Sequence, residues 1–241
     1  VMRSLHGAPG YNLQTAVETT SHLIVAHDVN AEASDQRQLQ PMAQAASAAL
    51  DKPCTVVADA GYANGEQLAA LDALGIESFV AVKRGVNNKG DGGLYDRTAF
   101  SYDASSDSFT CPAGQLLKRK QLSSKDNMVV YAASRENCGV CPKKPQCTGA
   151  AQRFVTRHLY EEALQANEKR LAEHPEMMGL RRQTVEHPYG TIKHQILGNA
   201  RLLMRGVAGA QAELSLAVLV YNLKRAINMK GAPWMRQALQ G

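Results

Sequence analysis

The first 83 residues alternate between strand-like and helix-like segments, and this alternation limits the chain to few folds. Short apolar or alternating runs predict strands, and apolar residues at helical spacing predict helices between them. Ser34 or Asp35 would cap the first helix. Strands that alternate with helices are typical of an α/β sheet. The expected order is strands at 10–18 and 22–29, a helix at 33–50, a strand at 55–59, a helix at 64–74 and a strand at 78–83.

The alternation stops after residue 83. Residues 84–96 are polar and rich in Gly and Asn, which indicates a loop. Residues 100–148 contain short strand-like pieces and four of the five cysteines. Helices resume at about 157–173 and break at His174-Pro175, and a long helix is expected at 210–228. We therefore divide the chain into a first α/β part (1–83), an insertion with the Cys cluster (84–155) and a helical C-terminal part (156–241).

Size and composition favour one aliphatic α/β core with a small satellite. The chain has 241 residues, of which 44% are apolar and only 5% aromatic. No run of about 18 apolar residues is present, so we expect no membrane partner. The N-terminal residues Val-Met-Arg-Ser-Leu-His lack the apolar centre of a signal peptide. A bacterial cytoplasmic protein is expected.

Two short motifs carry the chemistry. Asp59 ends an apolar run and is followed two residues later by Gly61, as when a buried strand presents a carboxylate at the open end of a sheet. Arg182, Glu186 and Lys193 recur at intervals of four and seven, which places them on one helix face. Two carboxylates brought together suit a Mg²⁺-dependent phosphoryl-transfer site. Alternatively, Asp59 only caps a turn and Glu186 is an ordinary acid of a first helical turn.

Pro188 leaves two possibilities for this helix. Proline is tolerated in a first turn but kinks a helix interior. Either the helix begins near Glu186, or it continues through Pro188 with a bend. In the first case Arg182 and Glu186 lose their four-residue relation, whereas Glu186 and Lys193 keep theirs.

These motifs resemble a known family. Asp59 in its Ala-Asp-Ala-Gly-Tyr setting and residues 184–193 (TVEHPYGTIK) are similar to bacterial insertion-sequence transposases of the DDE, RNase H-like superfamily. The helix signature of that family is Tyr-x2-Arg-x3-Glu-x6-Lys. Arg182, Glu186 and Lys193 match it, whereas Gly179 stands in place of the Tyr. The segment 10–17 (GYNLQTAV) also resembles a family strand, so the likeness covers nearly the whole chain.

The resemblance implies a fold and an activity. The fold would be an RNase H-like mixed sheet with flanking helices. Asp59 and Glu186 would be catalytic and would ligate Mg²⁺ or Mn²⁺ for phosphodiester hydrolysis and strand transfer in DNA transposition. Their carboxylates would then lie within roughly 4–8 Å of one another. The partners would be transposon ends and target DNA, and the active full-length form would be a homodimer.

The charge distribution agrees with a DNA partner. Net charge is +5, but residues 178–241 hold nine Lys and Arg against Glu186 and Glu213 only. We expect Arg182, Lys193, Arg201 and Arg205 to bind DNA phosphates, an interaction that weakens steeply with salt. The alternative is that these cations are ordinary solvated helix faces.

The third carboxylate of the family is missing. It would lie on the first strand of the fold, ahead of the segment 10–17. The nine residues before Gly10 contain no Asp or Glu, and neither Asp28 nor Asp35 matches that motif. We therefore expect a chain without its first strand and first catalytic Asp, and inactive as given. It would be a C-terminal fragment, a remnant gene or an internally started reading frame.

The cysteines suggest a second centre. Cys111, Cys138, Cys141 and Cys147 form a C-x26-C-x2-C-x5-C pattern. In a cytoplasmic protein this spacing favours metal over disulfide, either one tetrahedral Zn²⁺ or a [4Fe–4S] cluster. Unligated buried cysteines are the alternative.

Two other functions fit the same residues. One is an RNase H-like nuclease without strand joining, and the other is a non-catalytic DNA-binding remnant.

Five residues of the last long helix form one apolar stripe that we expect to face the core. They are Leu216, Leu219, Val220, Leu223 and Ile227.

Overall fold

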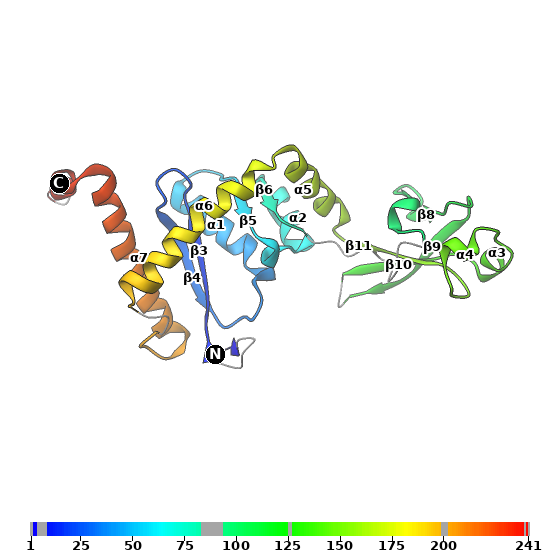
Figure 1. Ribbon diagram of the computed structural model, residues 1–241, viewed down its shortest axis with the longest axis horizontal. Helices are drawn as coiled ribbons and strands as arrows, with labels where there is room; N and C mark the ends of the chain where they lie inside the picture. Colours follow the sequence, from blue (N-terminus) through cyan, green and yellow to red (C-terminus); the bar gives the residue numbers. More distant parts are fainter. Residues whose placement is uncertain are drawn as a thin grey trace. The chain divides into compact units, whose positions relative to one another are not determined.

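A computed structural model describes residues 2–3, 9–82, 94–124, 127–198, 202–238 and 240. The chain divides into two compact units. Unit 1 contains residues 1–82 and 163–241, and unit 2 contains residues 83–162. Figure 1 shows the elements of both units. Unit 2 is therefore inserted in the sequence of unit 1, and each unit is described by itself below.

The strands of unit 1 form separate pairs. β3 (Asn12–Val17) pairs antiparallel with β4 (Ile24–Asn30), with a bulge between Ala16 and Val17. β5 (Val56–Ala58) pairs parallel with β6 (Ser78–Val80). Two short strands, β1 (Met2–Arg3) and β2 (Pro9–Gly10), pair with each other. Within the described ranges, no register joins β3–β4 to β5–β6.

The turn between β3 and β4 is held by one carboxylate. Glu18 accepts hydrogen bonds from the amides of Thr20 (2.9 Å) and Ser21 (2.6 Å) and from the Ser21 hydroxyl (2.6 Å). The Ser21 hydroxyl, with these amides, lowers the pKa of Glu18 to about 2. The segment between β3 and β4 is therefore an ordered turn.

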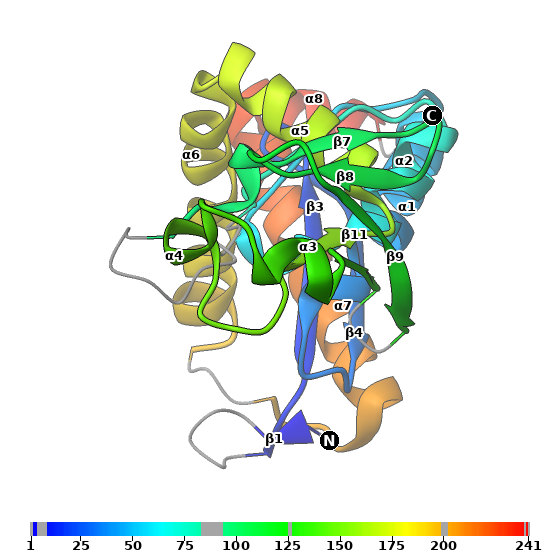
Figure 2. The ribbon, with the colours of Figure 1, turned by 90° about the vertical axis from the view of Figure 1, so that its right-hand side faces the viewer.

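Helices cover both sides of these strands. Figure 2 shows α6 and α1 on opposite sides of β3. Ser34 caps the short helix η1 and not α1, whose N-cap residue is Gln38 without a side-chain cap bond. Asn64 caps α2 by accepting from the Glu66 and Gln67 amides. The helical elements are η1 (Asp35–Arg37), α1 (Leu39–Leu50), η2 (Ala60–Tyr62), α2 (Gly65–Ala73), α5 (Glu161–Glu173), α6 (Glu176–Gly190), the π-helix η4 (Thr191–Ile196), α7 (Gly206–Lys230) and α8 (Ala232–Ala238).

Two apolar clusters hold unit 1 together. The first joins α1, α2, β5, β6 and the start of α5, with Leu68, Leu71 and Val80 fully buried at its centre. The second joins β4, η4 and α7, with Ala210 and Leu214 at its centre. Burying one Leu side chain contributes roughly 1.5–3 kcal/mol. Each strand pair thus has a core of its own.

Two asparagines close outer strand edges. Asn167 of α5 is fully buried, and its amide accepts from Val80 N and donates to Val80 O, both at 2.8 Å. Asn222 of α7 makes the same pair of bonds, both at 2.9 Å, with Ile24. A side-chain amide presents one donor and one acceptor, as a neighbouring strand residue would. The edges of β4 and β6 are therefore paired at these positions without another strand.

Unit 2 contains an antiparallel sheet of five strands in the order β11-β10-β9-β8-β7. Figure 2 shows β7, β8 and β9 together with α3 and α4. Tyr131, Phe109 and Leu117 are buried at the centre of its apolar cluster. Its elements are η3 (Arg97–Ala99), β7 (Ser101–Asp103), β8 (Ser108–Thr110), β9 (Leu116–Ser123), β10 (Met128–Ala132), α3 (Arg135–Gly139), α4 (Lys144–Cys147) and β11 (Phe154–His158).

The α/β fold class predicted from the sequence is confirmed, and its strand and helix alternation over 10–80 is observed. The helix expected from residue 157 is wrong at its start, because 154–158 form β11 and Val155 pairs with Tyr131 of β10. The loop predicted at 84–96 falls mostly outside the described residues. Of the two possibilities at Pro188, α6 begins at Glu176 and continues through the proline. Arg182 and Glu186 therefore keep their four-residue relation.

The prediction for the apolar stripe of the last long helix is wrong. Its five residues, led by Leu216 and Leu219, are exposed by 40–65%. The buried face of α7 instead carries Ala210, Leu214, Ala217, Val218 and Tyr221, which pack in the cluster with β4. Both faces are apolar, so helical periodicity cannot decide which one is buried. By length and composition alone α7 is also able to cross a membrane, a property shared by core helices of soluble proteins.

Candidate functional site

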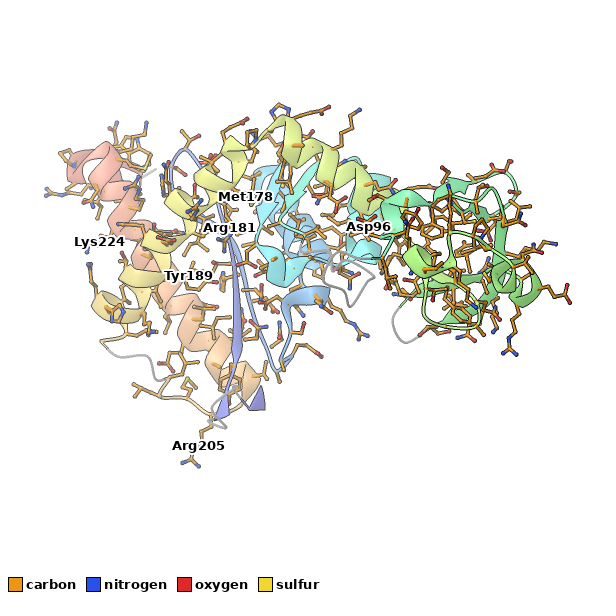
Figure 3. All side chains as sticks on the ribbon, turned by 45° about the vertical axis from the view of Figure 1, so that its right-hand side comes forward. Asp96, Met178, Arg181, Tyr189, Arg205 and Lys224 are labelled. Atoms are coloured by element: carbon orange, nitrogen blue, oxygen red, sulfur yellow. The ribbon has the colours of Figure 1, made fainter. Side chains whose placement is uncertain are left out.

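Asp59 lies at the carboxyl end of β5, where it caps η2. Its Oδ1 accepts a hydrogen bond from the Gly61 amide at 2.9 Å. Its Oδ2 accepts from Arg181 Nη2 at 2.5 Å. The Asp59 side chain is 44% exposed and that of Arg181 is 25% exposed. Figure 3 shows Arg181 and Tyr189 on α6. Asp59 is thus accessible to solvent and neutralised by an arginine of the helix that covers the strands.

A second carboxylate, Asp35, lies beside Asp59. Its Oδ1 accepts from Asn12 Nδ2 and Gln14 Nε2, both at 2.7 Å. Gln14 is 1% exposed, and its Oε1 accepts from the Tyr62 hydroxyl. Asn12 and Gln14 are two residues apart on β3 and so point to the same face. This face fixes the orientation of the Asp35 carboxylate.

Gly61 lies between the two acids. A Cβ on Gly61 would be 3.0 Å from Asp59 Oδ1 and 3.4 Å from Asp35 Oδ2. Oxygens of both carboxylates therefore lie within 3.4 Å of the same point. The absence of a side chain at residue 61 allows this approach. Hard divalent cations prefer such carboxylate oxygens as ligands.

Tyr62 and Tyr189 complete the surroundings of the acids. Burial raises the pKa of both phenols, and the negative charges of Asp35 and Asp59 add to the effect. The Tyr189 hydroxyl donates to Leu13 O at 3.1 Å. Both tyrosines are therefore neutral hydrogen-bond donors at physiological pH.

The three residues of the helix signature lie on α6 and on η4, which follows it. Arg182, Glu186 and Lys193 are all exposed. Arg181, one residue before the predicted Arg182, is the cation that reaches Asp59. Among the described residues, no hydrogen bond or ion pair joins Glu186 to Asp59. Val185, next to Glu186, lines the same cavity as Asp59. Glu186 is also five residues beyond Arg181, or about 7.5 Å along the helix axis.

The predicted cysteines come together in unit 2. Cys111, Cys138, Cys141 and Cys147 line one cavity of about 20 Å³. The turn after Cys111 has Gly114 at a φ of +76°, which brings the Gln115 amide to 3.3 Å from Cys111 Sγ. Burial raises the pKa of the Cys147 thiol, and the other three cysteines add to this effect. All five cysteines of the chain are free of disulfides.

Neither cluster is a preassembled metal site. Across the described ranges, no group of three or more His, Cys, Asp or Glu side chains is positioned to hold a metal ion. Asp35 and Asp59 provide two carboxylates at one point, and the four thiols share one cavity without ligating geometry. Each cluster has suitable donor atoms, but cation binding would require side-chain rotation.

The remaining predicted cations lie near the end of unit 1. Arg205 is exposed and immediately precedes α7, where it is the N-cap residue. Figure 3 marks Arg205 and Lys224. Lys224 Nζ donates to Gln195 Oε1 at 2.9 Å. Arg201 lies outside the described residues, so its prediction is untested.

The family of the chain follows from comparison with known proteins. Residues 6–223 match the family described as Transposase DDE domain. The match covers most of the chain, including both strand pairs and the acids at Gly61, and the chain belongs to this family. Membership implies a role in DNA transposition, a DNA partner and the divalent metal ions that such transposases generally use. No curated protein and no solved structure matches the chain.

The sequence interpretation missed two residues of this site. Asp35 was considered only as a helix cap and as an acid outside the family motif, and Arg181 only as part of a basic run. One signal for Asp35 was present, since polar Asn12 and Gln14 are two residues apart in the predicted strand and so share one of its faces. A buried Gln needs a polar partner, and Asp35 is that partner.

Proposed function

We propose that the chain is the DNA-processing domain of an insertion-sequence transposase with an RNase H-like fold. The observation that carries this proposal is the approach of Asp59 and Asp35 to one point at the carboxyl end of β5. Ligand sites in open α/β sheets lie outside the carboxyl ends of strands. Membership of the transposase family supports phosphodiester chemistry at this point.

Asp59 and Asp35 would hold a divalent cation, Mg²⁺ or Mn²⁺. Such an ion supplies a Lewis acid that activates water or a 3′-hydroxyl for attack on phosphorus. Glu186 would join the site as a further ligand. Arg181 now occupies Asp59 Oδ2, so a cation would compete with an ion pair of 2.5 Å. The arginine released by the cation would then be available to a DNA phosphate.

Exposed cations would hold the DNA backbone. Arg182 and Lys193 lie on the exposed side of α6 and η4, and Arg205 is exposed before α7; Arg201 is assigned the same role from the sequence. Each phosphate contact adds about −0.9 to the slope of log K against log salt. Arg182→Ala and Lys193→Ala should therefore weaken binding to a 30-base-pair duplex and each reduce the slope by about 1. Lys169→Ala, at an exposed site on α5, is the matched control.

The chain as given would bind DNA without cleaving it. Arg181 neutralises Asp59, and among the described residues no hydrogen bond or ion pair joins Glu186 to Asp59, so the acids as arranged hold a two-metal site poorly. We expect no Mg²⁺- or Mn²⁺-dependent nicking of supercoiled DNA by pure protein. Nicking that is abolished by both Asp59→Asn and Asp35→Asn would contradict this inactivity and assign Asp35 as the substitute acid.

A strand-transfer assay separates the alternatives. With DNA that carries transposon ends, joined products indicate a transposase, and cleavage without joining indicates a nuclease on the same scaffold. Salt-dependent binding without either reaction is the outcome for a DNA-binding remnant. Binding that is insensitive to salt and to Arg182→Ala would oppose a DNA function altogether.

The four cysteines of unit 2 would form a structural metal centre. Their shared cavity and the Gln115 amide bonded to Cys111 Sγ support this proposal, because amide donors stabilise metal-bound thiolates. One Zn²⁺ or a [4Fe–4S] cluster would satisfy four thiolates. Metal analysis and a visible spectrum of anaerobically purified protein distinguish the two. Cys54→Ser is the control that should retain the metal, and Cys141→Ser should lose it.

The exposed stripe of α7 would join two copies of the chain. Leu216, Val220, Leu223 and Ile227 follow one another at spacings of four, three and four, as in a two-helix seam. Leu216→Glu with Leu223→Glu should shift the mass in solution from dimer to the 26.1 kDa monomer. Asn228→Glu, on exposed α7 surface, should leave the mass in solution unchanged, and a monomeric parent protein would exclude this dimer.

In the cell, we place the protein in the bacterial cytoplasm, on DNA.

A further inference from the structure

A second groove of unit 1 lies between two helical segments, α6 with η4 on one side and α7 on the other. Its volume is about 250 Å³, just below the range of roughly 300–1,000 Å³ for drug-sized ligands. It shares no lining residue with the cavity that contains Asp59. We call it the α6–α7 groove, and its lining residues are His187, Thr191, Gln195, Tyr221, Lys224, Arg225 and Asn228.

Regular helical spacing brings these residues together. His187, Thr191 and Gln195 recur every four residues along α6 and η4. The α7 residues recur at spacings of three or four from Tyr221 to Asn228. Residues three or four apart share one helix face. The groove is therefore formed by two facing sides of helices rather than by loops.

The floor of the groove is buried, whereas its cations are accessible. Tyr221 is 2% exposed, and its hydroxyl donates to His22 O at 2.9 Å. The centroid of the His187 ring lies 6.3 Å from that of the Tyr221 ring. Thr191 is also buried, but His187 and Lys224 are exposed. An ion that entered the groove would thus meet the cations before the packed floor.

Two hydrogen bonds fix the cations of α7 in place. Arg225 Nε donates to Ser21 O at 2.7 Å. Lys224 Nζ, on the residue labelled in Figure 3, donates to Gln195 Oε1 at 2.9 Å. A guanidinium has five N–H donors and an ammonium has three. Both cations therefore keep further donors, and Gln195 keeps the donors of its side-chain amide.

No acid neutralises this charge in the part of the chain that the structure describes. There, no carboxylate forms an ion pair with Lys224, Arg225 or His187, and the described lining contains no Asp or Glu. Glu18, in the turn that Arg225 contacts, already accepts three hydrogen bonds within that turn. The groove thus offers positive charge and spare donors to a ligand that supplies acceptors.

We propose that the α6–α7 groove is a binding site for a phosphate group, held by Lys224, Arg225 and His187. Phosphate oxygens accept charge-assisted hydrogen bonds, which are stronger than neutral ones, and the arginine fork matches their geometry. The backbone of DNA and free phosphate present the same group. DNA as its source rests on the proposed function, whereas recognition of phosphate itself does not.

The first test uses inorganic phosphate as the probe, at constant ionic strength, on the intact chain. We expect saturable NMR shifts of the Gln195 side-chain amide and the His187 ring, because both line the groove. Acetate is the control for an anion without phosphate geometry and should bind at least about tenfold more weakly. Absence of saturable shifts with phosphate, or equal binding of acetate, would overturn the proposal.

Variants of α7 test the assigned residues. Lys224→Gln removes one charge-assisted bond, and Asn228→Glu adds a carboxylate to the lining. Each should weaken phosphate binding about tenfold or more. Lys230→Gln is the matched control, since Lys230 is exposed on the same helix but does not line the groove. An equal loss in Lys230→Gln, or no loss in Lys224→Gln, would contradict a site at this groove.

The salt dependence of DNA binding identifies the source of the phosphate. If the groove binds the DNA backbone, Lys224→Gln should reduce the slope of log K against log salt by about 0.9. An unchanged slope, together with weaker binding of inorganic phosphate, assigns the groove to free phosphate or a small phosphorylated molecule. Arg182 and Lys193 lie outside the groove, and the phosphate titration requires neither DNA nor metal. Failure of this site is therefore distinct from failure of the transposase proposal.

Discussion

Replacement of Asn167 by Ala tests how the outer edge of β6 is closed. Asn167 is fully buried, and its amide makes two hydrogen bonds of 2.8 Å to the backbone of Val80, which is itself fully buried. Alanine removes both bonds and leaves an amide and a carbonyl without partners. Each unsatisfied buried group costs about 1–3 kcal/mol. We therefore expect unit 1 to lose roughly 2–5 kcal/mol of stability.

Hydrogen exchange of the Val80 amide is the direct assay, because two units complicate a single unfolding free energy. Val80 should exchange about 30-fold faster or more in Asn167→Ala, and the urea midpoint of unit 1 should fall. Lys169→Ala, at an exposed site on the same helix, should change stability by less than about 0.5 kcal/mol. Unchanged protection of Val80 in Asn167→Ala would refute the idea that this side chain replaces a strand partner.

Two further predictions concern the turn and the acid site. Glu18 has a pKa lowered to about 2, mainly by Ser21, so it stabilises the fold above its ordinary pKa of 4.5, and this contribution is lost as pH falls toward 2. Glu18→Gln should flatten the melting temperature against pH in that window, and an unchanged slope would exclude Glu18 as its source. Gly61→Ala places a Cβ 3.0 Å from Asp59 Oδ1 and should therefore weaken Mn²⁺ binding at least about tenfold. Paramagnetic relaxation measures the Mn²⁺ affinity, and the circular dichroism spectrum should not change. Equal Mn²⁺ affinity in both proteins would separate metal binding from these carboxylates.

Sequence patterns predicted the helices and strands better than they predicted which faces of these elements are buried. The alternation of strands and helices from β3 to β6 was predictable because each segment has the apolar spacing of a strand or a helix. Residues typical of helix ends also mark the boundaries, such as Asn64 before α2 and Gly75 after it. The stripe that contains Leu216 and Leu223 was wrongly assigned to the core. Apolar residues at helical spacing show that they share one helix face, but not whether another element packs against that face. The face of α7 that includes Ala210 and Leu214 is the one that packs against β4.

The position of Asp59 in the candidate site was predictable from the sequence, whereas its neighbours Asp35 and Arg181 were not. A strand that ends on an acid places that acid at the sheet edge, as found. The partners of Asp59 come from 24 residues before it and 122 residues after it, namely Asp35 and Arg181. Such pairings depend on tertiary packing of η1 and α6, which local spacing does not encode. The cysteines of unit 2 were found together because their spacing within one small sheet limits how far apart they can lie.

Unit 2 is inserted in the sequence of unit 1, which affects how the chain can gain or lose it during evolution. Val82, just before unit 2, and Ala163, just after it, both pack in the same apolar cluster of unit 1. The chain thus leaves and re-enters unit 1 at the same apolar cluster. Insertions whose ends lie close together disturb a host domain little. Residues 83–162 therefore occupy a site at which a family can gain, lose or exchange an entire module while the host domain keeps its core.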